Sequence, residues 1–173
     1  MKKGHLTIIV ITTIVVIVMA DLRTELKQQR PFGSLAEEVF LNLQRTSDAL
    51  MRRVAETLKD ADLTPTQYNA LRILRGAGDD GIPCREVGDR MVTRDPDVTR
   101  LLDRLEARGL VERAREARDR RVITARIANP GLELLEVVDP KIAALLAAQL
   151  AHLDESALAA LNALLESARA ANE

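Results

Sequence analysis

The chain has 173 residues, a formal net charge of -1, 47% hydrophobic residues and one cysteine. The hydrophobic content argues against a disordered chain, and the lone Cys84 excludes an intrachain disulfide and cannot by itself form a zinc site. Because the net charge is close to zero, any affinity for nucleic acid has to arise from a local cluster of cations.

The first twenty residues, MKKGHLTIIVITTIVVIVMA, combine two lysines with an uncharged run from Leu6 to Ala20. Three interpretations stay open: a start site assigned too early or an added segment, since Met19 begins an ordinary polar sequence; a secretory signal or membrane anchor; or a strand or helix docked on the domain. As a helix, the run would span roughly 22 Å, short of a bilayer core of about 30 Å. Residues 1–20 are therefore assigned to a separate apolar segment.

A long amphipathic helix is predicted over residues 35–60, after a polar arm at 21–33. Ser34 is the expected N-cap, and Glu37 completes a capping box. Apolar residues recur at helical spacing at Leu35, Val39, Leu43, Leu50, Val54 and Leu58. This helix is longer than a small core needs, so residues 21–62 are predicted to form an N-terminal arm and dimerisation helix.

The string LTPTQYNALRIL predicts a second helix, with Thr64 as N-cap, Pro65 at the first helical position and Gln67 completing another capping box. The turn GAGDDG at 76–81 leads to a short extended piece, IPC, and a two-turn helix, REVGDRM. The side chains expected to be buried in these two helices are Tyr68, Leu71, Leu74, Val87 and Met91.

The next helix lies in VTRDPDVTRLLDRLEARG, with Asp95 as the expected N-cap, Pro96 at the first helical position and Gly109 as a left-handed C-cap. Its inward residues are Val98, Leu101, Leu102 and Leu105, and its outward residues are Asp97, Thr99, Arg100, Asp103 and Arg104. Two short helices joined by a tight turn, the second with a polar outer face, predict a helix-turn-helix. We call this second helix the reading helix.

Seven arginines and three acids lie between Arg108 and Arg126, a local excess of +4. LVER and RRVITARIA are predicted to form two strands around the polar turn AREARD, so this hairpin is a wing beside the helix-turn-helix. The helix can enter a major groove, and the arginines can reach phosphates or the adjacent minor groove. The alternative is a solvated loop in which Glu112, Glu116 and Asp119 balance the arginines. The position after the helix-turn-helix favours DNA, and residues 63–129 are predicted to form the DNA-binding lobe.

After the wing, Asn129-Pro130-Gly131 is expected to break the chain, and Pro140 is expected to kink or break the helix that follows. Asp154 is the expected cap of a last helix, ESALAALNALLESARAA. These helices carry more apolar surface than one winged lobe covers. Residues 130–173 are therefore predicted to form C-terminal dimerisation helices, with an intramolecular three-helix core as the alternative.

The predicted fold is mainly α with a small β-wing: a winged helix-turn-helix plus a helical dimerisation region. This order resembles the MarR family of bacterial transcriptional regulators over roughly residues 35–170. The strings that carry the likeness are LTPTQYNALRIL, VTRLLDRLEARGLVER, DRR at 119–121 and GLELL at 131–135.

The resemblance implies a homodimer that binds a pseudo-palindromic operator in double-stranded DNA and a small aromatic or phenolic effector in a cleft. The DNA-contacting residues it implies are Thr93, Arg94, Asp97, Thr99, Arg100, Arg104, Arg118, Asp119, Arg120 and Arg121. Arg100 and Arg104 would contact phosphate or guanine, and Asp97 either accepts from a cytosine amine or favours the helix N-terminus. Asp119 would brace Arg121, with Arg118 or Arg120 nearest the minor groove.

Two stretches depart from the family pattern. IANPG stands where LTEKG is usual, with Asn129 still able to cap the next helix, and RDPD places two acids near the DNA. Some relatives sense oxidants through a cysteine in their first helix, but Cys84 lies outside that helix. Polar groups are available to a ligand at Arg45, Arg52, Arg53, Tyr68 and His152, but these residues do not identify one.

The predicted function is a cytoplasmic, dimeric, sequence-specific regulator of transcription, a repressor released by a ligand. The alternative is a membrane-tethered regulator or signalling module anchored by residues 6–20. Because His5 and His152 are the only histidines and neither has a partner at meaningful spacing, we predict no catalytic site, no metal and no cofactor.

Overall fold

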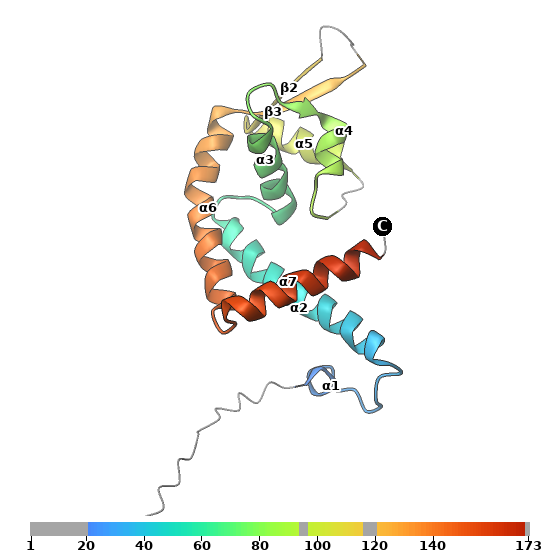
Figure 1. Cartoon of the computed structure of the whole chain (residues 1–173). Helices are drawn as coiled ribbons and strands as arrows, with labels where there is room; N and C mark the ends of the chain where they lie inside the picture. The colour runs from blue at the N-terminus through green and yellow to red at the C-terminus, as the bar shows by residue number, and fades with distance from the viewer. Residues whose placement is uncertain (1–20, 94–96, 116–120, 172–173) are drawn as a thin grey trace, which may run out of the picture. The chain divides into compact units, whose positions relative to one another are not determined.

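A computed structural model describes residues 21–93, 97–115 and 121–171 (Figure 1). The chain forms two compact units, Met1–Arg45 and Thr46–Glu173. Helix α2 (Leu35–Lys59) runs through the boundary between them and ends one residue before the predicted end. The assignment of residues 21–62, 63–129 and 130–173 to separate roles stays a prediction.

In the first unit, the predicted arm contains a short helix, α1 (Leu22–Glu25). The start of α2 confirms half of the capping box, because the Ser34 hydroxyl accepts a hydrogen bond from the Glu37 amide at 3.1 Å. The Glu37 carboxylate accepts from the amide of Gly33 at 2.7 Å, one residue earlier than the predicted Ser34 amide.

The apolar stripe of α2 is exposed along its first half. Leu35 is 75% exposed, and Val39, Phe40 and Leu43 are also exposed. Only Val54 and Leu58, near the end of α2, are buried. The helix therefore contributes to the core of the second unit through its last two turns alone.

Helix α3 (Pro65–Ala77) begins at the predicted residue. The Thr64 hydroxyl accepts from the Gln67 amide at 3.2 Å, and the Gln67 side chain accepts from the Thr64 amide at 2.9 Å. Both halves of the capping box satisfy backbone donors that the first helical turn leaves free. Tyr68, Leu71 and Leu74 are buried, as predicted from their spacing.

The helix-turn-helix follows strand β1 (Ile82–Pro83) and consists of α4 (Cys84–Asp89) and the reading helix α5 (Val98–Ala107). Val87 and Met91 are buried, as predicted. The prediction of Asp95 as the N-cap of α5 was wrong: Asp97 is the cap, and its carboxylate accepts from the Arg100 amide at 3.0 Å. Either aspartate precedes an apolar-periodic run, so local sequence did not distinguish them. Asp95 and Pro96 lie outside the described residues.

Gly109 ends α5 as predicted, with φ of 69°. The Gly109 amide donates to Glu106 O at 2.8 Å and the Leu110 amide to Leu105 O at 3.0 Å. This pair of bonds is a Schellman motif, which needs a left-handed residue at the position of Gly109. The chain thus turns directly from α5 into the wing.

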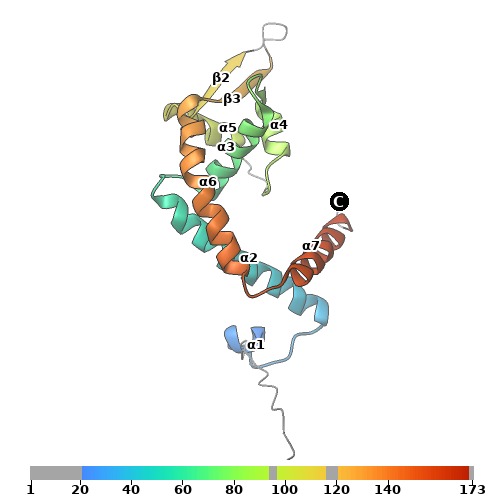
Figure 2. The same cartoon turned by 60° about the vertical axis from the view of Figure 1, so that its left-hand side comes forward.

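Strands β2 (Val111–Arg115) and β3 (Ile123–Ile127) form the predicted wing and, with β1, a three-stranded antiparallel sheet in the order β1-β3-β2. Val111 pairs with Ile127 and Arg115 with Ile123, so the hairpin has no bulge over these residues. Figure 2 shows the hairpin projecting from the sheet beyond α4 and α5.

Helix α6 (Asn129–Leu150) begins three residues before Leu132, the first residue after the predicted break at Asn129-Pro130-Gly131. Its N-cap is Ala128, which makes no side-chain cap bond, so the prediction that Asn129 caps this helix was wrong. Pro130 fits because amides in the first turn need no intrahelical partner. Pro140 does not end α6, which continues to Leu150. Helix α7 (Glu155–Ala170) is capped by Asp154 as predicted, through a 2.8 Å bond from the Ala157 amide.

The core of the second unit joins the end of α2, helices α3 to α6 and the sheet. Its fully buried large side chains are Leu58, Leu71, Leu74, Val87, Leu102, Leu105, Val111 and Leu135. A polar link crosses the edge of this core between α3 and α6. The Tyr68 hydroxyl donates to Asp139 Oδ1 at 2.5 Å, and Arg75 Nη1 donates to Asp139 Oδ2 at 2.6 Å.

We expect this link to make the stability of the protein sensitive to alkaline pH. Burial and the bond to Asp139 raise the pKa of Tyr68 to about 12. Because the folded pKa exceeds the ordinary value of about 10, the stabilisation is complete below pH 10 and is lost as pH rises towards 12. We expect Tyr68→Phe to remove this part of the alkaline loss, measured as the free energy of unfolding in urea across that range.

Tyr68 is the only tyrosine and the chain has no tryptophan, so ultraviolet absorbance reports its ionisation directly. The folded protein should titrate at higher pH than the urea-unfolded protein. Titration of both states near pH 10 would contradict the link.

Candidate nucleic-acid interface

The outer face of α5 presents the polar side chains that the sequence predicts. Thr99, Arg100 and Arg104 are exposed. The Arg100 guanidinium lies 3.7 Å from the Asp97 carboxylate, which also caps the helix. Among the described residues, no hydrogen bond or ion pair involves Arg104, so its charge is available to a ligand.

The other predicted contact residues are only partly within the described chain. Thr93, before α5, and Arg121, before β3, are both exposed. Arg94, Arg118, Asp119 and Arg120 lie outside the described residues, so the predicted bracing of Arg121 by Asp119 stays a prediction.

At least three of the seven arginines counted in the local excess are engaged within the protein. The Arg108 guanidinium donates to the backbone carbonyls of Ala61, at 3.1 Å, and Asp62. Arg126 donates to Glu112 at 2.5 Å. Arg113 donates to Asp103 at 2.5 Å and Glu106 at 2.6 Å. Fewer arginines are therefore available to contact DNA than the sequence count suggests.

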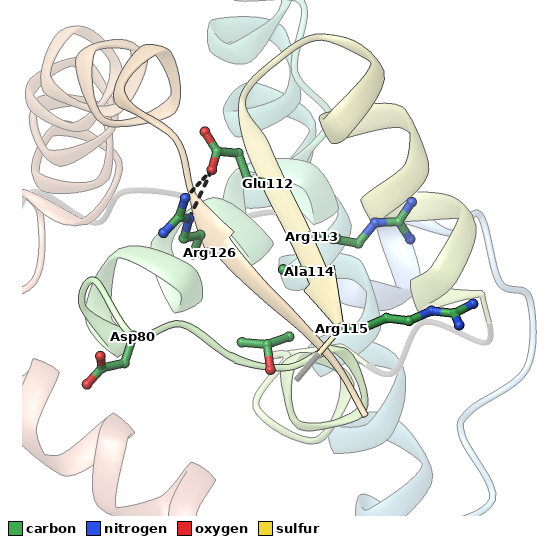
Figure 3. Close-up of a pocket in the computed structure, with 7 residues that line it drawn as sticks. Asp80, Glu112, Arg113, Ala114, Arg115 and Arg126 are labelled. Carbon is green, nitrogen blue, oxygen red and sulfur yellow. Dashed lines mark hydrogen bonds and ion pairs between the residues drawn. The ribbon is translucent and has the colours of Figure 1, made fainter. Parts of the chain in front are cut away.

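Arg115 was not among the predicted DNA-contacting residues. It is an exposed cation at the end of β2. In Figure 3, Arg113 and Arg115 extend to one side of the strand, while Glu112 and Arg126 meet on the other. Within the described part of the chain, Arg113 has acidic partners and Arg115 has none. Strand alternation from Arg113 is the signal that would have found Arg115.

A shallow hollow of about 400 Å³ lies beside the hairpin (Figure 3). It is lined by residues from both faces of the hairpin and by Asp80: Asp80, Glu112, Arg113, Ala114, Arg115, Thr124 and Arg126. Its charged lining residues are two acids and three arginines, so the hollow has no strong preference for either charge. It therefore adds little to the attraction of the wing for phosphate.

Arg104 and Arg115 have no acidic partner in the described part of the chain. Each should contribute more to the salt dependence of DNA binding than a surface cation elsewhere. We expect Arg104→Gln and Arg115→Gln each to reduce the slope of log affinity against log salt by about 0.9 if the side chain contacts a phosphate. If Arg104 instead reads guanine, affinity for the specific duplex should fall by about 1–3 kcal/mol, with little change for a scrambled duplex. Fluorescence anisotropy on both duplexes separates these outcomes.

Lys141→Gln provides a matched control, because Lys141 is an exposed cation on α6, outside the helix-turn-helix and wing. Its slope should equal that of the native protein. Equal slopes for all three variants would show that neither Arg104 nor Arg115 contacts a phosphate. If the affinity of Arg104→Gln for the specific duplex is also unchanged, Arg104 does not read guanine either.

In the part of the chain that the structure describes, no helix is both long and apolar enough to cross a membrane. The same residues contain no cluster of three or more potential metal ligands. Residues 6–20, to which the predicted anchor refers, lie outside the described residues.

Known proteins share this arrangement. The profile of the MarR family matches residues 61–122. The transcriptional repressor MdtR of Bacillus subtilis is 29% identical over 121 residues, which cover 70% of this chain and 77% of MdtR. The crystal structure of a MarR transcription factor from Planctomyces limnophilus is 37% identical, has a TM-score of 0.62, and is matched over 79% of this chain and 98% of that one.

The fold also matches the Staphylococcus aureus MepR–DNA complex, with a TM-score of 0.69, 21% identity and coverage of 75% of this chain and 94% of that one. These similarities confirm the predicted fold class and the prediction of a regulator rather than an enzyme. The chain belongs to the MarR family of winged helix-turn-helix, DNA-binding transcriptional regulators.

Proposed function

We propose that the protein is a homodimer that binds a pseudo-palindromic operator and represses transcription until a small ligand releases it. The observation that carries the proposal is the outer face of α5 beside the wing. There Arg100, Arg104 and Arg115 are exposed, while Arg113 neutralises the nearby acid Asp103. This distribution leaves cations facing the solvent where a groove and its phosphates would lie.

The contacts proposed for this face are those of Thr93, Arg94, Thr99, Arg100, Arg104, Arg118, Arg120 and Arg121, with Asp119 bracing Arg121. Asp97 belongs to the same face, but its capping bond to the Arg100 amide already occupies one carboxylate oxygen. Its proposed role is therefore to start α5 in the correct place, and a contact with cytosine is secondary.

The dimer is supported by apolar surface on α7. No residue of this helix is buried, although Leu158, Leu161, Leu164 and Leu165 recur at spacing typical of one helix face. Leu164 is 70% exposed. Leu161 and Leu165 are also exposed, and Leu158 is half-buried. An apolar row of this kind usually marks a protein interface, and a second copy provides an identical apolar row.

Repression and its release are the remaining parts of the proposal. MdtR is a repressor, which supports the same sign of regulation here. The resemblance to the family supports a small aromatic or phenolic effector, and its binding would change the spacing between the two reading helices of the dimer. Occupancy of the operator would exclude the polymerase, and the effector would end this exclusion.

Sedimentation equilibrium tests the assembly directly. The protein alone should have twice the mass of one chain, and its complex with an operator duplex should contain two chains per duplex. Addition of salicylate, as a representative phenolic acid, should dissociate the complex without dissociating the dimer. If the protein is a monomer and binds the operator duplex as tightly as a dimer is expected to bind, the proposed assembly is wrong. If a panel of aromatic acids leaves the complex intact, the proposed effector class is wrong.

A further inference from the structure

One arginine of the wing, Arg113, is held by several hydrogen bonds and is largely covered by the protein. Arg113 shares a face of β2 with the buried Val111, as the two-residue period of a strand requires. Its side chain is only 18% exposed. A guanidinium in such a position needs acidic partners, because leaving a charge unpaired there is costly.

Two acids of the reading helix provide those partners. Arg113 Nε donates to Glu106 Oε2 at 3.0 Å and Arg113 Nη2 to the same oxygen at 2.6 Å. The Arg113 amide donates to Glu106 Oε1 at 3.2 Å. A further bond joins Arg113 Nη2 to Asp103 Oδ1 at 2.5 Å. Glu106 thus binds both the backbone and the side chain of Arg113.

We infer that Arg113, Glu106 and Asp103 form a clamp that fixes the wing relative to the reading helix, and that Arg113 is a positioning residue for DNA binding rather than a DNA contact. The clamp joins the two elements that have to meet the duplex together. Because its Nε and Nη2 donors point at carboxylates, a phosphate cannot use these donors without breaking the clamp. The inference rests on the proposed binding of DNA by α5 and the wing.

The clamp predicts a result opposite in sign to that of simple electrostatics. Glu106→Gln removes a negative charge from the DNA-binding lobe, which by itself should strengthen binding to phosphates. It also removes the charge that holds Arg113 and frees that arginine to contact DNA. If the clamp positions the wing, however, the same substitution should weaken binding.

Glu112→Gln is the matched control. Glu112 is also a carboxylate beside an arginine of the hairpin, but its partner, Arg126, lies on the other face and both side chains are exposed. Its loss removes the same charge without affecting the contact between α5 and β2. Its binding should equal or exceed that of the native chain.

The experiment first selects duplexes from a random library with the native chain and then measures the affinities of the variants across a salt series. We expect Glu106→Gln to bind about tenfold more weakly than the native chain, a difference of about 1.4 kcal/mol, and Glu112→Gln to bind no more weakly. Arg113→Met should bind weakly with an unchanged salt slope. A double variant of Glu106 and Arg113 should lose little more than either single variant.

Native or tighter binding by Glu106→Gln, or a salt slope for Arg113→Met reduced by about 0.9, would overturn the clamp. Circular dichroism and thermal unfolding show whether each variant is folded at the temperature of the measurement. If the library selection enriches no sequence, the proposed sequence specificity fails. The clamp is then tested on a random duplex, where the same order of affinities is expected.

Discussion

Leu164→Asp should convert the dimer to a monomer and weaken operator binding by about 100-fold or more. Leu164 is the most exposed leucine of α7, a helix with no buried residue. A carboxylate at this position would have to lose its hydration without a partner when the proposed interface forms. A monomer would bind one half-site only. It would lose the increase in affinity that comes from linking two reading helices, which reaches about 10²–10⁴-fold in favourable cases.

Ala159→Asp adds the same charge to the same helix and serves as its control. Ala159 is exposed and lies roughly 140° around α7 from Leu164, at 100° per residue. Sedimentation equilibrium and fluorescence anisotropy on one operator duplex provide the two measurements. If Leu164→Asp stays dimeric and binds like the control, the α7 leucines are not the dimer interface.

Gly131→Ala should destabilise the second unit by about 3 kcal/mol, although alanine is normally the better helix former. Gly131 lies in the first turn of α6, where an added Cβ would collide with the backbone carbonyl oxygen of Leu110 and lie 2.8 Å from Ile127 Cγ1. The Leu110 carbonyl cannot move freely, because it accepts a 3.0 Å hydrogen bond from the Ala128 amide. The helix would have to move away from the wing instead.

Gly76→Ala is the contrasting substitution in α3. An added Cβ at Gly76 meets no heavy atom within 4 Å. We expect this variant to be as stable as the native chain or more stable by up to about 1 kcal/mol. Urea denaturation of both variants measures the difference, and equal stabilities would show that α6 and the wing do not approach as closely as described.

Several element boundaries were predictable because capping is a local property. Thr64 with Gln67, Asp154 and Gly109 each mark a boundary by side-chain chemistry or backbone conformation within a few residues. The same locality explains the errors. Two aspartates compete before α5, and nothing nearby distinguishes Asp97 from Asp95.

The contacts between distant segments were not predictable in this way. The Tyr68–Asp139 bond joins residues 71 positions apart, so no local spacing indicates it. The clamp could be predicted in part from the sequence. Strand alternation places Arg113 on the same face as Val111, and a half-buried arginine requires acids nearby. Counting arginines as equivalent cations concealed that requirement.

The most direct test of sequence-specific regulation is the affinity of the full chain for the DNA upstream of its own coding region and for a scrambled duplex, measured across a salt series. We expect binding to the upstream DNA to be about 10³-fold tighter than to the scrambled duplex, with both affinities falling steeply as salt rises. Equal, weak binding to the two duplexes, together with no enrichment from a random library, would contradict sequence-specific recognition by α5 and the wing.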